Sequence, residues 1–164
     1  MRRKALVVGF DKFLSVVSAC CVVMSLGAGE FDLAGIWRLS QTDDRSVACP
    51  AVVPGGNYAA LVAAGLLPEP NFGFNEIEVQ WPRTRDWTFA RTFVLPEGFA
   101  RGCSVVLRLE GVALFATIVL NGQVVGRTDD RFIRYDFEVG HALRPGENEI
   151  ELRFDSTERM AVVE

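Results

Sequence analysis

Apolar and polar residues alternate along the second half of the chain with a period of two, which predicts half-buried β-strands. Strands are expected over 87–96, 103–110, 133–139 and 149–155, each with one apolar face turned toward a core. The segment GIWRLS, residues 35–40, is predicted to be a further short strand. Residues 114–120 are apolar on both faces, which favours a central position in a sheet.

Turn signals separate these strands. Asn121-Gly122 lies between two apolar runs, and this pair favours a type I′ hairpin because both residues tolerate a positive φ. The segment from Arg144 to Asn148 contains Pro-Gly and predicts a second turn before the last strand. Six to eight antiparallel strands with turns at short intervals predict an all-β fold, a β-sandwich.

One short helix is expected directly after the strand 35–40. Asn57 is predicted to be its N-cap, with one or two turns starting at Tyr58, and Gly65 occupies the place of a left-handed C-terminal residue. Pro68 and Pro70 then prevent the helix from continuing.

Residues 1–29 differ from the rest of the chain. The basic start MRRK and the apolar run ending in small residues are typical of a helical secretory signal peptide, interrupted here by Asp11-Lys12. Two alternatives stay open: a lipoprotein box ending at Cys20, or an uncleaved anchor, and only these would tie the protein to a membrane. The prediction is therefore a leader over 1–29, a β-sandwich over 32–156, and the start of a truncated continuation over 157–164.

Charge argues against a nucleic-acid partner. The formal net charge is −4, and setting aside the four basic residues and one acid of 1–29 leaves 13 arginines against 20 acidic groups. Nucleic acids are bound chiefly through neutralised phosphates, which an acidic surface without basic clusters does not provide.

The sequence gives little support for a metal site or for a catalytic triad. The single histidine, His141, precedes a Pro-Gly turn and is predicted to lie on the surface. Neither a CxxC nor an HExxH motif is present, and Asp129-Asp130 lacks the alternating oxygen donors of a calcium loop. No metal, cofactor or catalytic residue is assigned within the chain, and pairing of Cys49 with Cys103 is left open.

The segment FNEIEVQW, residues 74–81, contains two carboxylates that a glycosidase could use. Glu76 and Glu78 would lie on one face of a strand roughly 7 Å apart. A short polar segment offers nothing to exclude water around them, so a catalytic role is not expected. Trp37 and Trp87 are predicted to pack in the core, whereas Trp81 is equally suited to the core or to stacking on a sugar.

The order of motifs resembles the N-terminal domain of β-mannosidases of glycoside hydrolase family 2. The likeness extends over about 32–156 and rests on these segments: LAGIWRLS, VPGGNYAALVAAGLLPEPNFGFNEIEVQW, RDWTFARTFVLP, LRLEGVALFATIVLNGQVVGRTDDRFIRYDFEV and LRPGENEIELRFDS. The DW pair and the loop before it favour β-mannosidases over the galactosidases and glucuronidases of the same family.

The resemblance implies a galactose-binding-like jelly-roll belonging to an enzyme that removes terminal non-reducing β-D-mannose by a retaining mechanism. The two catalytic glutamates belong to a downstream barrel that this segment lacks. The β-mannoside is therefore expected to bind to that barrel, and this segment is expected to be inactive alone. It also implies that Asn75 reaches the active site and orients substrate, with hydrogen bonding within its own loop as the alternative. Trp81 is a second candidate substrate contact because its aromatic ring could stack on a sugar. The expected location is the secretory pathway, lysosomal or extracellular. A free-standing carbohydrate-binding or adhesion module is the alternative.

Overall fold

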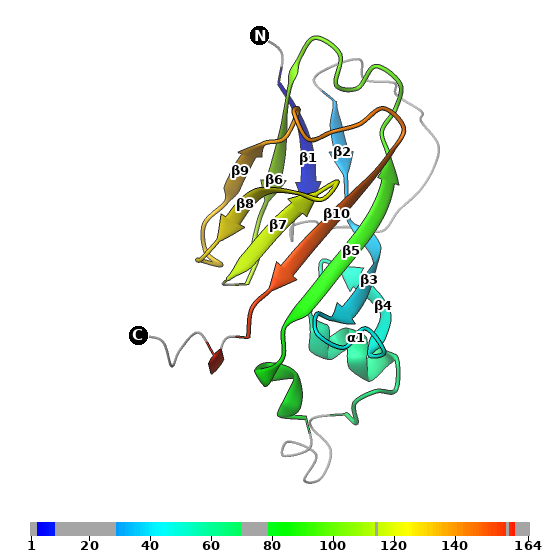
Figure 1. Cartoon of the computed structure of the whole chain (residues 1–164), viewed down its shortest axis with the longest axis vertical. Helices are drawn as coiled ribbons and strands as arrows, with labels where there is room; N and C mark the ends of the chain where they lie inside the picture. Colours follow the sequence, from blue (N-terminus) through cyan, green and yellow to red (C-terminus); the bar gives the residue numbers. More distant parts are fainter. Residues whose placement is uncertain (1–2, 9–28, 70–78, 114, 157, 160–164) are drawn as a thin grey trace, which may run out of the picture.

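The protein is described from a computed structural model that covers residues 3–8, 29–69, 79–113, 115–156 and 158–159. Two β-sheets pack face to face in this part of the chain (Figure 1). The four-stranded sheet has the order β2-β1-β6-β9, and the six-stranded sheet has the order β4-β3-β5-β10-β7-β8. The predicted sandwich is confirmed.

The strands have the following bounds: β1 Arg3–Val8, β2 Glu30–Asp32, β3 Gly35–Gln41, β4 Ala48–Val53, β5 Trp87–Val94, β6 Ser104–Leu109, β7 Ala116–Leu120, β8 Gln123–Thr128, β9 Tyr135–Glu138 and β10 Glu147–Phe154. The helix α1 covers Asn57–Ala63, and a short 3-10 helix, η1, covers Trp81–Thr84. None of the described helices has the length and hydropathy of a membrane span.

The core lies between the two sheets and is built by the alternating residues of the sequence pattern. Val105, Leu107 and Leu109 of β6 are fully buried, as are Ile150 of β10 and Leu39 of β3. Removing such a side chain from water contributes about 1.5–3 kcal/mol to folding. The alternation therefore supplies the main driving force for joining the sheets.

Hydrogen bonds of the Asn121 and Asn148 side chains connect the two predicted turns. Asn121 has φ 51° and Gly122 has φ 82°, as the hairpin between β7 and β8 requires. Asn121 Nδ2 donates to Asn148 Oδ1 at 2.8 Å, and Asn148 Oδ1 also accepts from the backbone N of Arg144 at 2.8 Å. Asn148 is buried, so each of these bonds satisfies a polar group that has little access to water.

The region after β3 differs from the prediction. An edge strand, β4, follows β3 before the helix and was not predicted; it contains Pro50, which a strand tolerates at the edge of a sheet. The N-cap is Gly56, not Asn57: the Oδ1 atom of Asn57 accepts from the neighbouring N of Tyr58 at 3.0 Å. Gly65 has φ 69°, which confirms the predicted helix end.

The strand expected over 133–139 begins two residues later, at Tyr135. The Tyr135 hydroxyl accepts hydrogen bonds from the backbone N of Asp129 and Asp130 and donates to Asp129 Oδ1 at 2.6 Å. These bonds close a loop over residues 129–134, which leaves Ile133 largely exposed. The aspartate pair thus serves a turn, as expected.

β1 lies inside the segment predicted to be a helical leader, and it is a strand. It pairs in parallel with β2 on one side and with β6 on the other, whereas every other described ladder is antiparallel. Hydropathy alone does not distinguish an apolar leader from a buried strand, which explains the difference over residues 3–8. Residues 9–28 lie outside the described part, and a leader there stays a prediction.

The two cysteines and the histidine do not form a cluster in the described part of the chain. Cys49 is buried and Cys103 is half-buried, and both are free thiols. His141 is exposed beside Glu138, with 3.3 Å between its Nδ1 and the Glu138 Oε2. No group of three metal-ligating side chains occurs among the described residues.

We expect Gly126→Ala to lower the free energy of unfolding by about 1–3 kcal/mol, since overpacking costs this much. A Cβ at this position of β8 would lie 2.3 Å from the Phe137 ring of β9, where the two sheets approach. Chemical denaturation measures the change. In a Phe137→Ala background the same substitution should cost far less, and an equal cost in both backgrounds would refute the clash.

Candidate functional site

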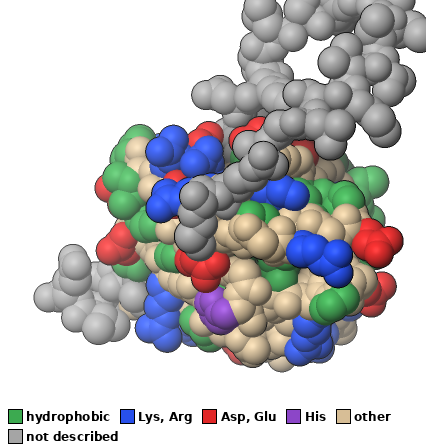
Figure 2. All heavy atoms as spheres, turned by 90° about the horizontal axis from the view of Figure 1, so that it is seen from above, with side chains coloured by type: hydrophobic (Ala, Val, Ile, Leu, Met, Phe, Trp, Pro, Cys, Tyr) green, Lys and Arg blue, Asp and Glu red, His purple; other side chains and the backbone are tan. Residues whose placement is uncertain are grey.

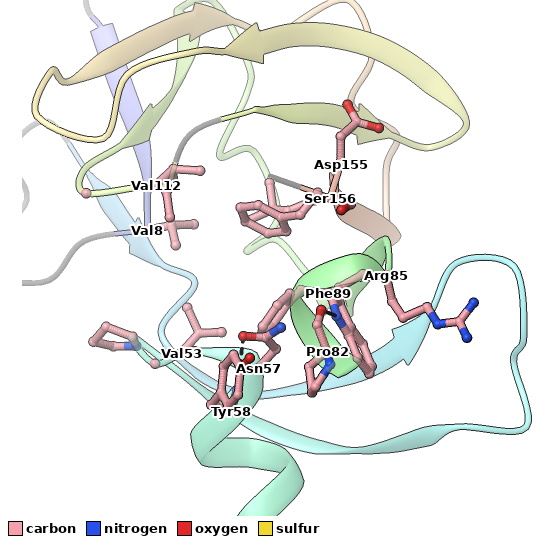
Figure 3. A pocket seen from close by; sticks show the side chains of 18 of the residues that line it. Val8, Val53, Asn57, Tyr58, Pro82, Arg85, Phe89, Val112, Asp155 and Ser156 are labelled. Carbon is pink, nitrogen blue, oxygen red and sulfur yellow. Dashed lines mark hydrogen bonds between the residues drawn. The ribbon is translucent and has the colours of Figure 1, made fainter. Parts of the chain in front are cut away.

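A cavity of about 370 Å³ opens at one end of the sandwich (Figure 3). Five segments far apart in sequence form it: the end of β1, the loop leading into α1, the stretch from η1 into β5, the turn after β6, and the end of β10. The lining residues are Val8, residues 53–58, Pro82, Arg83, Arg85, Trp87, Phe89, residues 110–113, Leu152 and residues 154–156. Val8 and Val112 face Pro82 and Phe89 across the cavity.

Trp81 and Trp87 form a pair beside this cavity. Their ring centroids are 5.8 Å apart, and Trp87 Nε1 donates to the carbonyl of Pro82 at 2.9 Å. Trp87 lines the cavity, but Trp81 does not belong to its lining and packs against the core from η1. Trp87 therefore occupies the core position predicted for it, as does Trp37, whose Nε1 donates to Leu33 O.

Polar side chains line the cavity from several elements: Asn57 and Tyr58 of α1, Arg83 and Arg85 at η1, Glu110 after β6, and Asp155 and Ser156 after β10. Tyr58 is half-buried at the start of α1, and burial raises the pKa of its phenol, while nearby Arg83 acts in the opposite direction and Glu158 adds to the rise. Arg83 forms a 3.1 Å ion pair with Glu158. Positive and negative charges are thus both present near the Tyr58 side of the cavity.

Asp86 fixes the segment that follows β10. Its Oδ1 accepts from the backbone N of Ser156 at 2.7 Å, and its Oδ2 is 2.5 Å from the Arg159 guanidinium. The Ser156 hydroxyl donates to the carbonyl of Arg83 at 2.9 Å and accepts from the N of Arg159. We call Asp86, Ser156 and Arg159 the exit clamp. It positions Asp155, Ser156, Glu158 and Arg159 against η1 at the rim of the cavity.

The exit clamp was missed in the sequence, where residues 157–164 showed no pattern of partners. The signal available was Asp86 itself, an acid directly before a buried strand, but its partners lie about 70 residues away in sequence. Asn75, Glu76 and Glu78 lie outside the described residues. Leu67 and Val79, which flank that unplaced segment, are both buried, so the segment starts and ends at the folded domain.

The chemistry of the cavity suits an apolar group better than a free sugar. Valine, proline and aromatic side chains form most of its wall. A pyranose carries several hydroxyl groups around its ring, and burying them without hydrogen-bond partners is unfavourable. On the face shown in Figure 2, basic and acidic side chains intermingle, with no large area of one sign.

Comparison with known protein families identifies the family of the chain. Residues 37–163 match the model of the family described as "Glycosyl hydrolase 2 galactose-binding domain-like". The chain belongs to this family. The matched region thus contains most of β3, all of β4 to β10, the cavity-lining residues other than Val8, and the exit clamp.

The similar curated proteins are β-mannosidases. The β-mannosidase of Rattus norvegicus is 33% identical over 144 residues, which are 87% of this chain and 16% of the relative. A probable β-mannosidase of Caenorhabditis elegans is 33% identical over 130 residues, 79% of this chain and 14% of that protein. The chain therefore spans about one sixth of the length of these relatives.

Solved structures agree with this fold. The β-D-mannosidase of Dictyoglomus thermophilum superposes with a TM-score of 0.75 at 38% identity, covering 78% of this chain and 16% of that one. The exo-chitosanase of Amycolatopsis orientalis superposes with a TM-score of 0.65 at 15% identity, covering 74% and 16%. The second likeness shows the fold alone.

We expect Asp86→Ala to lower the free energy of unfolding of this family 2 domain by about 1–3 kcal/mol, because the buried N–H of Ser156 loses its acceptor. Denaturant unfolding followed by tryptophan fluorescence measures the change. Asp155→Ala is the matched control: its carboxylate is 47% exposed and 3.8 Å from Arg159, so a change within about 0.5 kcal/mol is expected. Equal effects of the two substitutions would contradict the exit clamp.

Proposed function

We propose that the chain is the N-terminal accessory domain of a β-mannosidase and does not hydrolyse glycosides by itself. The observation that supports this most directly is its similarity to β-mannosidases over 87% of its length, within only 16% of theirs. The complete enzyme would remove terminal non-reducing β-D-mannose by a retaining reaction, which needs two carboxylates about 5–5.5 Å apart. In this proposal both carboxylates come from parts of the enzyme beyond the matched segment.

The role of this domain is to shape and support the active site of that enzyme. We propose that Asn75 orients the mannoside, because its loop is attached at both ends to buried residues, Leu67 and Val79. Trp81 is proposed as a second substrate contact. It lies in η1, directly after that loop, and its ring is only partly buried.

The proposed location is the secretory pathway, lysosomal or extracellular. Its support is the apolar run ending in small residues within 1–29, of which residues 3–8 form the strand β1. The substrate then consists of the mannosides of oligosaccharides and glycoproteins found in that compartment.

A free-standing carbohydrate-binding module is the second candidate. The observation that favours it is the cavity itself, which has Trp87 and Phe89 in its wall and Asn57 and Tyr58 near them (Figure 3). Aromatic faces pair with the apolar faces of sugar rings. The scarcity of polar groups in the wall favours the accessory role instead.

The proposed function is tested with a chromogenic β-mannoside. We expect no turnover by the 164-residue chain, and we expect hydrolysis by a chimera in which residues 32–156 replace the matching segment of the Dictyoglomus thermophilum enzyme. Turnover by the chain alone would overturn the proposal. Calorimetric binding of mannose by the chain, abolished in Tyr58→Ala, would support the free-standing module.

In that chimera, Asn75→Ala should lower kcat/KM about tenfold or more, since one hydrogen bond to the substrate is lost. Asn71→Ala, in the same loop, is the matched control and should leave kcat/KM within about twofold. Steady-state kinetics and a thermal unfolding curve are measured for both variants. A similar loss in both, or none in either, would exclude the proposed role of Asn75.

A further inference from the structure

The proposed hydrolysis makes no use of the cavity at the end of the sandwich. Its volume of about 370 Å³ lies within the range of small-molecule sites in proteins, roughly 300–1,000 Å³. An apolar cavity of about 150 Å³ accepts a benzene molecule, so this one has room for about two aromatic rings. Gly55, Gly56 and Gly111 form part of the wall and have no side chain with which to fill the space.

Aromatic rings form one wall of the cavity. Trp87 and Phe89 are almost fully buried, and the ring of Phe154 stands at 75° to that of Phe89 with 5.6 Å between their centroids. Rings in such a wall attract a further ring, edge to face or offset, beyond the effect of buried area alone. Val8 and Val112 lie across the cavity from Phe89 (Figure 3). The wall therefore favours a flat aromatic ligand over an aliphatic chain.

Two polar side chains lie at the edge of this apolar space. Asn57 and Tyr58 are half-buried and line the cavity on the α1 side. Within the described part of the chain, neither the Tyr58 hydroxyl nor the Asn57 Nδ2 has a hydrogen-bond partner in the protein. Burial raises the pKa of the Tyr58 phenol, so its hydroxyl stays protonated and can both donate and accept. A hydroxyl or amide group of a ligand can be bound there.

The charged groups at the rim favour a neutral ligand. Arg83 forms an ion pair with Glu158 at 3.1 Å, and the carboxylate of Asp155 lies 3.8 Å from the guanidinium of Arg159. Opposite charges thus face each other within the protein, and they leave little net attraction for an ion.

We infer that the cavity is a binding site for a neutral aromatic molecule of one or two rings that carries one hydroxyl or amide group. Its rings lie against Trp87, Phe89 and Phe154, and its polar group hydrogen-bonds to the Tyr58 hydroxyl. A monosaccharide is a poor ligand for this site, because most of its hydroxyl groups would be buried without partners. The inference is independent of the proposed hydrolase function.

The probe for this site is 2-naphthol, two fused rings with one hydroxyl, and its binding to the full chain is measured by equilibrium dialysis. We expect one saturable site with a dissociation constant on the order of 0.1–1 mM, as for other ligands of about ten atoms. An excess of methyl β-D-mannoside should not displace the probe. Displacement would assign the cavity to sugars, and that result or a lack of saturable binding would overturn the inference.

Two matched substitutions locate the bound probe. Val112→Phe extends a larger side chain into the cavity and should weaken binding about tenfold or more, because the space is filled. Val52→Phe makes the same change on the outer face of β4, where Val52 is 67% exposed, and should alter binding by less than about twofold. Equal effects of the two would place the probe elsewhere on the protein and contradict the inference.

Tyr58→Phe tests the polar edge, and it decides the matter if Val112→Phe does not fold. Loss of the hydroxyl should weaken binding of 2-naphthol about two- to tenfold and leave binding of naphthalene unchanged, since naphthalene has no hydroxyl to bind. Thermal unfolding curves establish that each variant is folded. An equal loss for the two probes, or an unchanged affinity for 2-naphthol, would refute the proposed site.

Discussion

The insertion of β10 between β5 and β7 is the constraint on which the sandwich depends. This strand pairs with β5 over eight residues and with β7 over five, and it buries Ile150 and Leu152 while turning Glu149 and Glu151 outward. A shift of one residue would exchange these faces and bury the glutamates, at a cost that no local interaction could offset. The strict alternation along β10 therefore sets the register of the larger sheet.

The same insertion builds the cavity. Because β10 ends at Phe154, the next two residues, Asp155 and Ser156, lie at the cavity. There the backbone N of Ser156 donates a hydrogen bond to Asp86. Asp86 directly precedes β5, so the neighbouring strands β5 and β10 bring the two ends of the exit clamp together. The path of Asp155 and Ser156 after β10 is thus set by sheet pairing, and the clamp secures it.

The fold alone does not indicate the substrate. A sandwich of the same shape occurs in an exo-chitosanase at low identity, so the architecture does not specify a sugar. The connection to β-mannosidases rests on sequence identity and on the motifs around residues 70–78. In the proposed enzyme, specificity would come from a few loop residues supported by a rigid sandwich, which explains how related enzymes can keep the sandwich and differ in substrate.

Most of the sandwich could be predicted from the sequence because each half-buried strand repeats its apolar residues with period two. The hairpin at Asn121-Gly122 and the helix end at Gly65 were equally accessible, since both depend on a local positive φ. The edge strand β4 was not predicted; it contains Pro50, which a strand tolerates at an edge, and edges are not visible in a sequence.

The candidate site was less accessible. The sequence singled out Trp81 and Asn75 through their motif, but it assigned no role to Asp86, whose partners Ser156 and Arg159 meet it through tertiary contacts. Residues 3–8 show the same limit: their apolar character was clear, yet whether they lead a chain to a membrane or complete a sheet depends on the space between β2 and β6. Strand periodicity and turn preferences depend on residues close together in sequence, so the sequence by itself determined the strands and turns. Pairing across long separations depends on which surfaces meet, and only the tertiary structure decided the place of β1, the cavity and the exit clamp.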